Sequence, residues 1–72
     1  MTEYPPSGAQ MKETYTQISK MIRARMGWTQ QELANEVGCA VSTIAILERT
    51  PGRFPIRRIR VELLRIRNKF RQ

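Results

Sequence analysis

The sequence predicts an all-α domain, and three observations support this prediction. Apolar residues recur at steps of three and four along most of the chain, which is the spacing of one helix face. No stretch alternates apolar and polar residues as a half-buried strand would. Gly and Pro residues stand at the ends of the apolar runs, where helices stop and start. A chain of 72 residues has room for one compact domain, which we expect to contain four or five helices.

The first 11 residues carry no helical pattern. Pro5-Pro6 is followed by Ser7-Gly8, a composition that is typical of loops. We therefore expect a disordered tail over 1–11, a folded domain over 12–69 and a basic C-terminal end over 70–72.

The first helix is predicted over 12–26. Its apolar residues Tyr15, Ile18, Ile22 and Met26 fall on one face, and Gly27 ends it.

The second helix has a strong start signal. Thr29 and Glu32 stand at the spacing of a capping box, in which each side chain accepts a hydrogen bond from the other residue's backbone amide. Trp28 and Leu33 occupy the two positions of a hydrophobic staple. The inward residues are predicted to be Leu33, Ala34 and Val37, and the helix should stop at Gly38.

Two further helices complete the predicted domain. One covers 41–49, with Ile44 and Leu47 buried, and breaks at Thr50-Pro51-Gly52. Pro55 permits the start of the last helix. Its apolar positions are Ile56, Ile59, Leu63, Ile66 and Phe70.

The charge of the chain is uneven. It has 13 Lys and Arg residues against 6 Asp and Glu, a net charge of +7. Residues 1–36 carry four basic and four acidic groups, whereas 37–72 carry nine basic and two acidic groups. A basic surface of this kind favours an acidic partner such as nucleic acid, an anionic membrane or an acidic protein.

Several function classes lack the residues they need. The chain has no histidine and one cysteine, Cys39, which excludes an internal disulfide, a thiolate-rich zinc site and histidine-based nucleophile pairs. We therefore expect no metal, no cofactor and no enzymatic activity. No apolar run approaches the roughly 20 residues of a membrane span, and no signal-peptide pattern follows Met1. The predicted location is the cytoplasm, with no membrane partner.

Two short helices joined by Gly38-Cys39-Ala40 fit a helix-turn-helix unit, whose second helix can lie in a DNA major groove. Ala34 supplies the small residue that the helix crossing needs. The run from Ile22 to Ala34 (IRARMGWTQQELA), followed by Val37-Gly38, Ile44 and Leu47-Glu48-Arg49, resembles the Cro/C1-type helix-turn-helix family of phage repressors and bacterial regulators. The resemblance covers residues from about 12 to 66.

The resemblance implies roles for individual residues. Gln30, Thr43 and Arg53 would contact DNA phosphates, and Val41, Ser42 and Ile46 would face base edges. Arg23 and Glu48 match a pair that forms a structural salt bridge in the family. The charge density of the last helix adds Arg57, Arg58 and Arg60 as phosphate contacts.

The sequence departs from the family pattern in three ways, one of which is that Thr50-Pro51-Gly52 displaces the usual Gly after the Glu. The other two concern the predicted recognition helix itself. Ala40 replaces the usual Ser or Thr cap, and the outward residues are Val41, Ser42, Ala45 and Ile46. None of these four has the bidentate reach of Arg, Lys, Asn or Gln that base readout normally uses. This face can therefore meet either DNA or a protein.

Two functions follow from these observations. The first is a small prokaryotic or phage transcription regulator, such as a repressor, that binds double-stranded DNA in the cytoplasm of the cell or infected host. The alternative is a helix-turn-helix scaffold that regulates transcription by docking on RNA polymerase or another regulator. The chain could also form a homodimer, with Val61, Leu64 and Phe70 as the candidate contact residues.

Overall fold

The computed structural model of the chain describes residues 14–70, and these residues form four helices in one compact arrangement. The helices are α2 (Tyr15–Met26), α3 (Gln30–Val37), α4 (Val41–Arg49) and α5 (Arg57–Lys69). The part of the chain between 14 and 70 contains no strand, so the all-α prediction is confirmed. The predicted tail over 1–11, the first residues of the predicted first helix and the last two residues of the chain lie outside the described residues.

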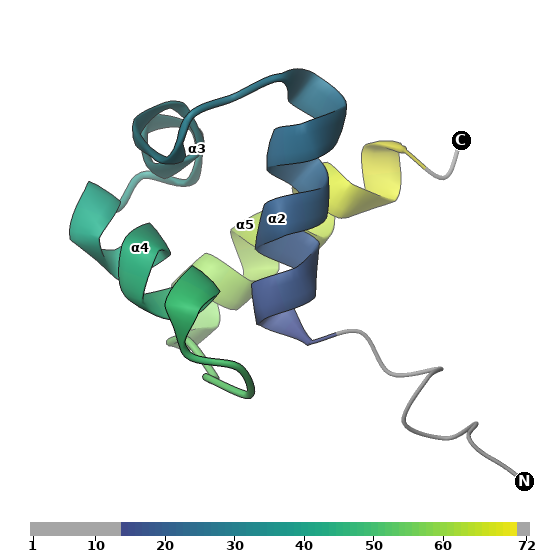
Figure 1. The fold of residues 1–72 in the computed structure, drawn as a ribbon. Coiled ribbons are helices and arrows are strands. Elements are labelled where there is room, and N and C mark those ends of the chain that lie inside the picture. The colour runs from purple at the N-terminus through teal and green to yellow at the C-terminus, as the bar shows by residue number, and fades with distance from the viewer. Residues whose placement is uncertain (1–13, 71–72) are drawn as a thin grey trace, which may run out of the picture.

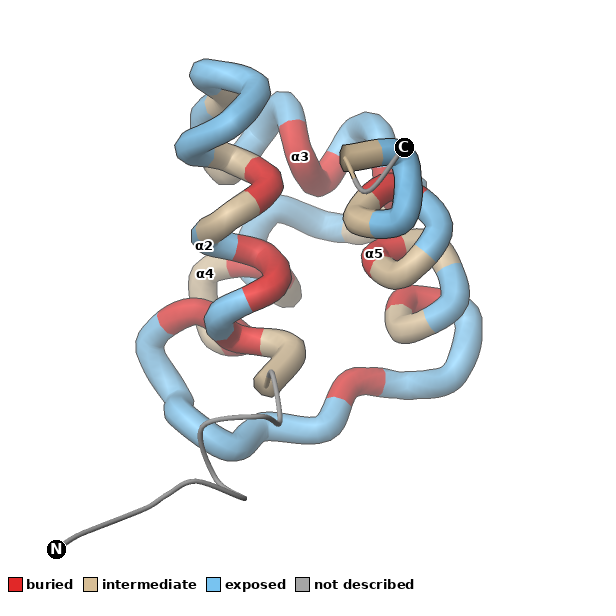
Figure 2. The backbone as a smooth tube through the Cα atoms, turned by 90° about the vertical axis from the view of Figure 1, so that its right-hand side faces the viewer, coloured by how far each residue is buried: buried red, intermediate tan, exposed pale blue. Residues whose placement is uncertain are grey.

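Helices α3 and α4 lie on one side of the molecule, and α2 crosses in front of α5 on the other (Figure 1). Helix α4 packs against both α3 and α2, and α5 packs against α2. The buried stretches of all four helices face the centre of this arrangement (Figure 2). The core consists of Ile18, Ile22, Leu33, Ala34, Val37, Ile44, Leu47, Ile59, Leu63 and Ile66.

The predicted start of the second helix and the predicted ends of the first two helices are confirmed. Thr29 Oγ1 accepts from the Glu32 amide at 3.1 Å, and the Glu32 carboxylate accepts from the Thr29 amide at 2.7 Å. Gly27 and Gly38 close α2 and α3 with φ of 69° and 85°, the left-handed conformation that glycine adopts without strain. Trp28 is half-buried and packs against the core.

Two predicted core positions are wrong, and two residues of the expected dimer surface are partly buried instead. Met26 is 45% exposed, because it is the last residue of α2 and lies beyond the part of that helix that the core covers. Ile56 is 64% exposed, because α5 begins one residue later and the inward place before it is taken by buried Pro55. Leu64 and Phe70 were expected on a dimer surface, but both are half-buried and pack against the core. Val61, which is 50% exposed, is the one residue of that expected surface left outside.

None of the helices between residues 14 and 70 has the length and apolar character needed to cross a lipid bilayer.

Candidate nucleic-acid interface

The outward face of α4 is the centre of the candidate interface. Val41 and Ser42 are exposed at its first turn, Ala45 and Ile46 are half-buried in the middle, and Arg49 is exposed at its end. We call these five residues the α4 face. The turn 38–40, which begins with the left-handed Gly38, sets the angle at which α4 leaves α3. Buried Ile44 and Leu47 fix which side of α4 faces outward.

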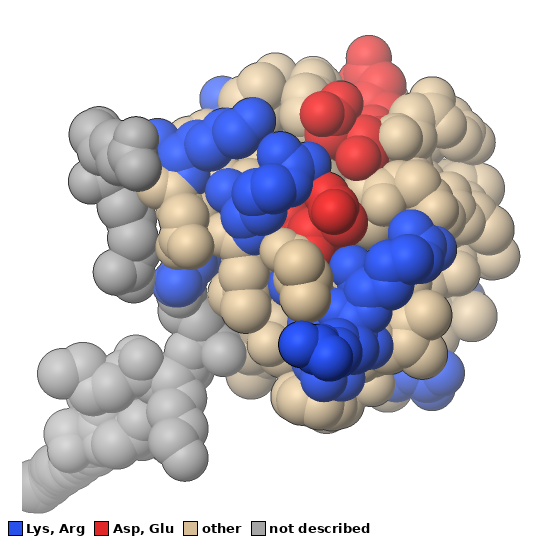
Figure 3. Space-filling model, turned by 180° about the vertical axis from the view of Figure 1, so that it is seen from behind, with Lys and Arg blue, Asp and Glu red and all other residues tan. Residues whose placement is uncertain are grey.

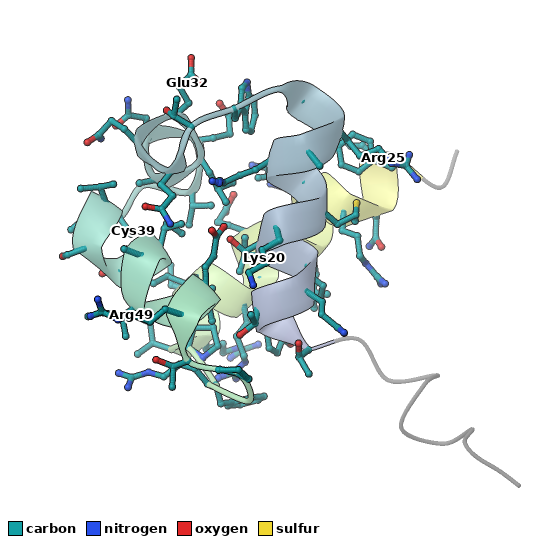
Figure 4. All side chains as sticks on the ribbon, viewed as in Figure 1. Lys20, Arg25, Glu32, Cys39 and Arg49 are labelled. Atoms are coloured by element: carbon teal, nitrogen blue, oxygen red, sulfur yellow. The ribbon has the colours of Figure 1, made fainter. Side chains whose placement is uncertain are left out.

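Three arginines lie at or after the end of α4, and we call Arg49, Arg53 and Arg57 the arginine rim. Arg49 is part of the α4 face, Arg53 stands in the loop 50–56 and Arg57 is the first residue of α5. All three are exposed. Their guanidinium groups make no hydrogen bond or ion pair with any other residue in the range 14–70. Arg49 points away from the molecule at the end of α4, on the side opposite to Arg25 (Figure 4). These guanidinium groups are therefore available to an external anion.

Two of the arginines predicted to contact phosphates are engaged within the protein. Arg58 donates to the carbonyl oxygen of Gly38 at 3.0 Å and to that of Val37 at 3.5 Å, so it satisfies the C-terminal end of α3. Arg60 donates to the Pro55 carbonyl oxygen at 2.8 Å. Both side chains therefore help to hold α5 and its preceding loop in place, and the sequence alone gave no sign of these contacts.

Glu48 is the centre of a buried polar network that joins three helices. Its side chain is 7% exposed. Ser19 Oγ donates to Oε2 at 2.6 Å, Gln30 Nε2 donates to Oε1 at 3.2 Å, and Arg23 Nε lies 3.5 Å from Oε2. The structure thus brings the predicted Arg23–Glu48 pair together. It also ties Gln30 to the same carboxylate, which leaves the second N–H of the Gln30 amide for an external acceptor.

A shallow pocket of about 260 Å³ opens beside the α4 face. Thr43, predicted to touch the DNA backbone, is half-buried and lines this pocket together with Ile46 and Arg53. The remaining lining residues are Leu47, Phe54, Pro55, Ile56 and Ile59. The pocket therefore joins the end of α4, the loop 50–56 and the start of α5.

Lys and Arg side chains also gather on the face that carries α5, around a smaller group of acidic side chains (Figure 3). On this face Glu62 binds Arg65, with 2.6 Å between Oε1 and Nη2. Arg65 is thus paired with an acidic side chain of its own helix, whereas the sequence between Arg49 and Val61 contains no acidic residue.

Cys39 lies half-buried in the turn between α3 and α4 as a free thiol. Burial raises the pKa of this thiol above its usual value, and the neighbouring Arg58 guanidinium lowers it by a smaller amount. Within residues 14–70, no three His, Cys, Asp or Glu side chains are grouped so that they could hold a metal ion.

Two residues of the interface were missed at the sequence level. Arg49 stands three residues after Ile46, so helical spacing could have placed it on the α4 face. Phe54 lies in the loop before α5 and is 68% exposed. No periodicity applies within a loop, so no signal in the sequence indicated which way its ring would point.

Comparison of the chain with models of protein families, with curated protein sequences and with solved structures found no match to any of them.

Proposed function

We propose that this chain is a small transcription regulator that binds double-stranded DNA through α3 and α4, in the cytoplasm of a prokaryotic cell or a phage-infected host. The observation that carries the proposal is the arginine rim, whose three exposed guanidinium groups have no partner within residues 14–70 and which begins at the end of α4. Exposed guanidinium groups without an internal partner are the groups that bind phosphates along a duplex. The resemblance of the sequence to Cro/C1-type regulators points in the same direction.

In this proposal the rim positions α4 on the duplex, and the α4 face contributes little base readout. Arg53 and Arg57 would contact phosphates, and Gln30 would add one amide donor at the first turn of α3. Val41 and Ile46 can touch thymine methyl groups, and Ser42 can make one hydrogen bond. Arg49 is the only long polar side chain on the face, so we expect strong salt dependence and modest sequence selectivity.

The test is the salt dependence of binding to a duplex of random sequence, measured by fluorescence anisotropy. The logarithm of affinity should fall linearly with the logarithm of salt concentration, with a slope of about −0.9 for each phosphate contacted. The triple variant Arg49→Gln, Arg53→Gln, Arg57→Gln should flatten this slope by about two to three units. The matched control, Arg25→Gln, Arg65→Gln, Lys69→Gln, removes the same charge elsewhere and should flatten it by less than one unit, about the contribution of a single phosphate contact.

Equal slopes for the two triple variants would mean that attraction to DNA is a property of the net charge alone. Absence of duplex binding by the unchanged protein at about 50 mM salt, where phosphate contacts are strongest, would contradict the proposal altogether.

A second candidate function is docking on RNA polymerase or another regulator, and the apolar side chains of the α4 face favour it. Val41 is exposed, and Ile46 lines the same pocket as the exposed Phe54 and Ile56. Ile46→Lys separates the two functions, because a lysine is poorly accommodated in an apolar protein interface but adds attraction to a duplex. We expect this variant to bind random duplex at least as tightly as the unchanged protein. Retention of RNA polymerase that is lost with Ile46→Lys, together with weak duplex binding, would favour docking.

A further inference from the structure

The pocket beside α4 holds an exposed aromatic ring in a fixed orientation. The Phe54 ring meets the Tyr15 ring edge-on, with centroids 5.5 Å apart and an interplanar angle of 76°. The Arg60 guanidinium lies over the same ring, 4.3 Å from its centroid. Arg60 also donates to the Pro55 carbonyl oxygen, so one side chain holds both the ring and the loop. These contacts set the orientation of the Phe54 ring, and the Arg60 guanidinium covers one of its faces, although the residue as a whole is 68% exposed.

The surroundings of the ring are apolar inside and cationic outside. Ile46 and Ile56 line the pocket next to Phe54, above buried Ile59 and Pro55. The charge comes from two residues of the arginine rim: Arg53 stands within the loop 50–56, and Arg57 follows that loop. A ligand that suits this site has a flat apolar part for the pocket and anionic groups that reach Arg53 and the exposed arginines near it in sequence.

We propose that this pocket binds one unpaired nucleobase, stacked against Phe54, while the arginine rim binds the phosphates that flank it. Stacking of bases on aromatic side chains within a basic groove is the usual chemistry of binding to unpaired strands, and it requires no base-edge readout. That fits an α4 face with almost no groups for such readout. The inference rests on the proposed DNA-binding function and adds a preference for DNA that carries an unpaired base over fully paired duplex.

The experiment compares three DNAs that differ at one position: a paired duplex, the same duplex with a single bulged adenine, and the same duplex with a bulged abasic nucleotide. The abasic bulge has the backbone charge and flexibility of the adenine bulge but no base. We expect the protein to bind the adenine bulge about tenfold more tightly than the abasic bulge. A tenfold difference in affinity lies within the range expected for the stacking of one base on an aromatic side chain. The paired duplex and the abasic bulge should bind within about twofold of each other.

Phe54→Leu keeps an apolar side chain but removes the stacking face, so it should reduce the tenfold preference to less than about twofold. Phe70→Leu is the matched control, because Phe70 also lies against an arginine, Arg25, but belongs to the far end of α5. It should keep the preference. Circular dichroism melts show whether both variants fold. If Phe54→Leu does not fold, Ile56→Ser changes the pocket at an exposed side chain and should also lower the preference.

Three results would overturn the inference. Equal affinity of the unchanged protein for the adenine and abasic bulges would contradict the binding of a base in this pocket. It would leave the proposed DNA-binding function standing. A preference that survives Phe54→Leu would place the base elsewhere. Selective displacement of the bulged DNA by a peptide of alternating Glu and Leu, compared with one of Glu and Ser, would assign the pocket to an acidic protein segment. Failure to bind any of the three DNAs would contradict the proposed function as well.

Discussion

The two halves of this domain begin their helices in different ways. In the first half, α2 and α3 each start with a complete capping box, Thr14 with Gln17 and Thr29 with Glu32. In the second half, α4 starts after Ala40 and α5 after Ile56, and neither residue makes a side-chain cap hydrogen bond. The first half can therefore specify its helices locally, whereas the second half relies on packing and on contacts with the rest of the domain.

The helix ends show the same contrast. Glycines in the left-handed conformation close α2 and α3, but α4 closes at Thr50 without one. The Leu47 carbonyl oxygen near this end of α4 accepts from Thr16 Oγ1 of α2 at 2.7 Å. A side chain from the first half thus satisfies a backbone group of the second half.

Charge divides the molecule in the same place. Residues 1–36 are neutral overall, while residues 37–72 carry the whole net charge of +7. Acidic groups are favoured at the positive end of a helix, and among the four helices only α3 has one in its first turn, Glu32. Local rules are most often broken at functional sites, where a binding surface takes precedence over stability. This is why we place the function in the second half and the local stability in the first.

The largest effect should come from breaking the link between the halves. Glu48→Ala removes the carboxylate that accepts from Ser19 and Gln30 and that pairs with Arg23. Because these groups are buried or half-buried, we expect the free energy of unfolding to fall by about 2–3 kcal/mol, with the melting midpoint lower by about 10–20 °C. Thermal and urea denaturation followed by circular dichroism measure both quantities.

Glu62→Ala is the control for this prediction, because it removes a partly exposed ion pair with Arg65 and should cost less than about 1 kcal/mol. Equal losses for the two variants would show that the Glu48 network does not tie the halves together.

A smaller effect is expected from the capping box of α3. Thr29→Ala removes the acceptor for the Glu32 amide and should lower the free energy of unfolding by about 1 kcal/mol. Thr50→Ala makes the same substitution at an exposed residue whose side chain makes no hydrogen bond to any residue of the described range. It should change stability by less than about 0.5 kcal/mol. If the two variants have the same melting midpoint, α3 does not depend on its local cap. The contrast between the halves is then weaker than we propose.

The smallest effect is a gain. Ala40 has the extended backbone of a helix N-cap, with φ −73° and ψ 147°, so Ala40→Ser can place a hydroxyl where α4 lacks one. We expect the free energy of unfolding to rise by about 0.5–1 kcal/mol, seen as a higher melting midpoint. An unchanged midpoint would mean that the first turn of α4 gains nothing from a side-chain cap.

Much of the fold was predictable from particular residues. Thr29, Glu32 and Gly38 marked both ends of α3, because capping boxes and left-handed glycines act over four or five neighbouring residues. The spacing of Ile18 and Ile22 placed the inward face of α2 for a similar reason. Prediction failed at Ile56, because the choice between Pro55 and Ile56 as the inward residue depends on how the loop 50–56 reaches the core.

The candidate site was less predictable than the fold. The sequence indicated an arginine-rich second half, but it could not distinguish Arg53 and Arg57, which face outward, from Arg58 and Arg60, which bind backbone carbonyls. All four are arginines within eight residues of one another, and their sequence neighbours are alike. What distinguishes the two pairs is whether a backbone carbonyl oxygen lies within hydrogen-bonding distance of the guanidinium group.

By itself, the sequence determined the all-α class, the C-terminal end of α2, both ends of α3 and the concentration of charge after Glu36, because these properties depend on local spacing and composition. It did not determine the start of α2, which was expected at residue 12 but follows the N-cap Thr14. The tertiary structure alone decided that Gln30 and Ser19 meet at Glu48, that Arg58 closes α3, and that Phe54 is held exposed beside α4. Each of these contacts joins residues at least 18 positions apart, or fixes a loop that has no repeating pattern. Such contacts form only when the packed helices bring their side chains within hydrogen-bonding or ring-contact distance.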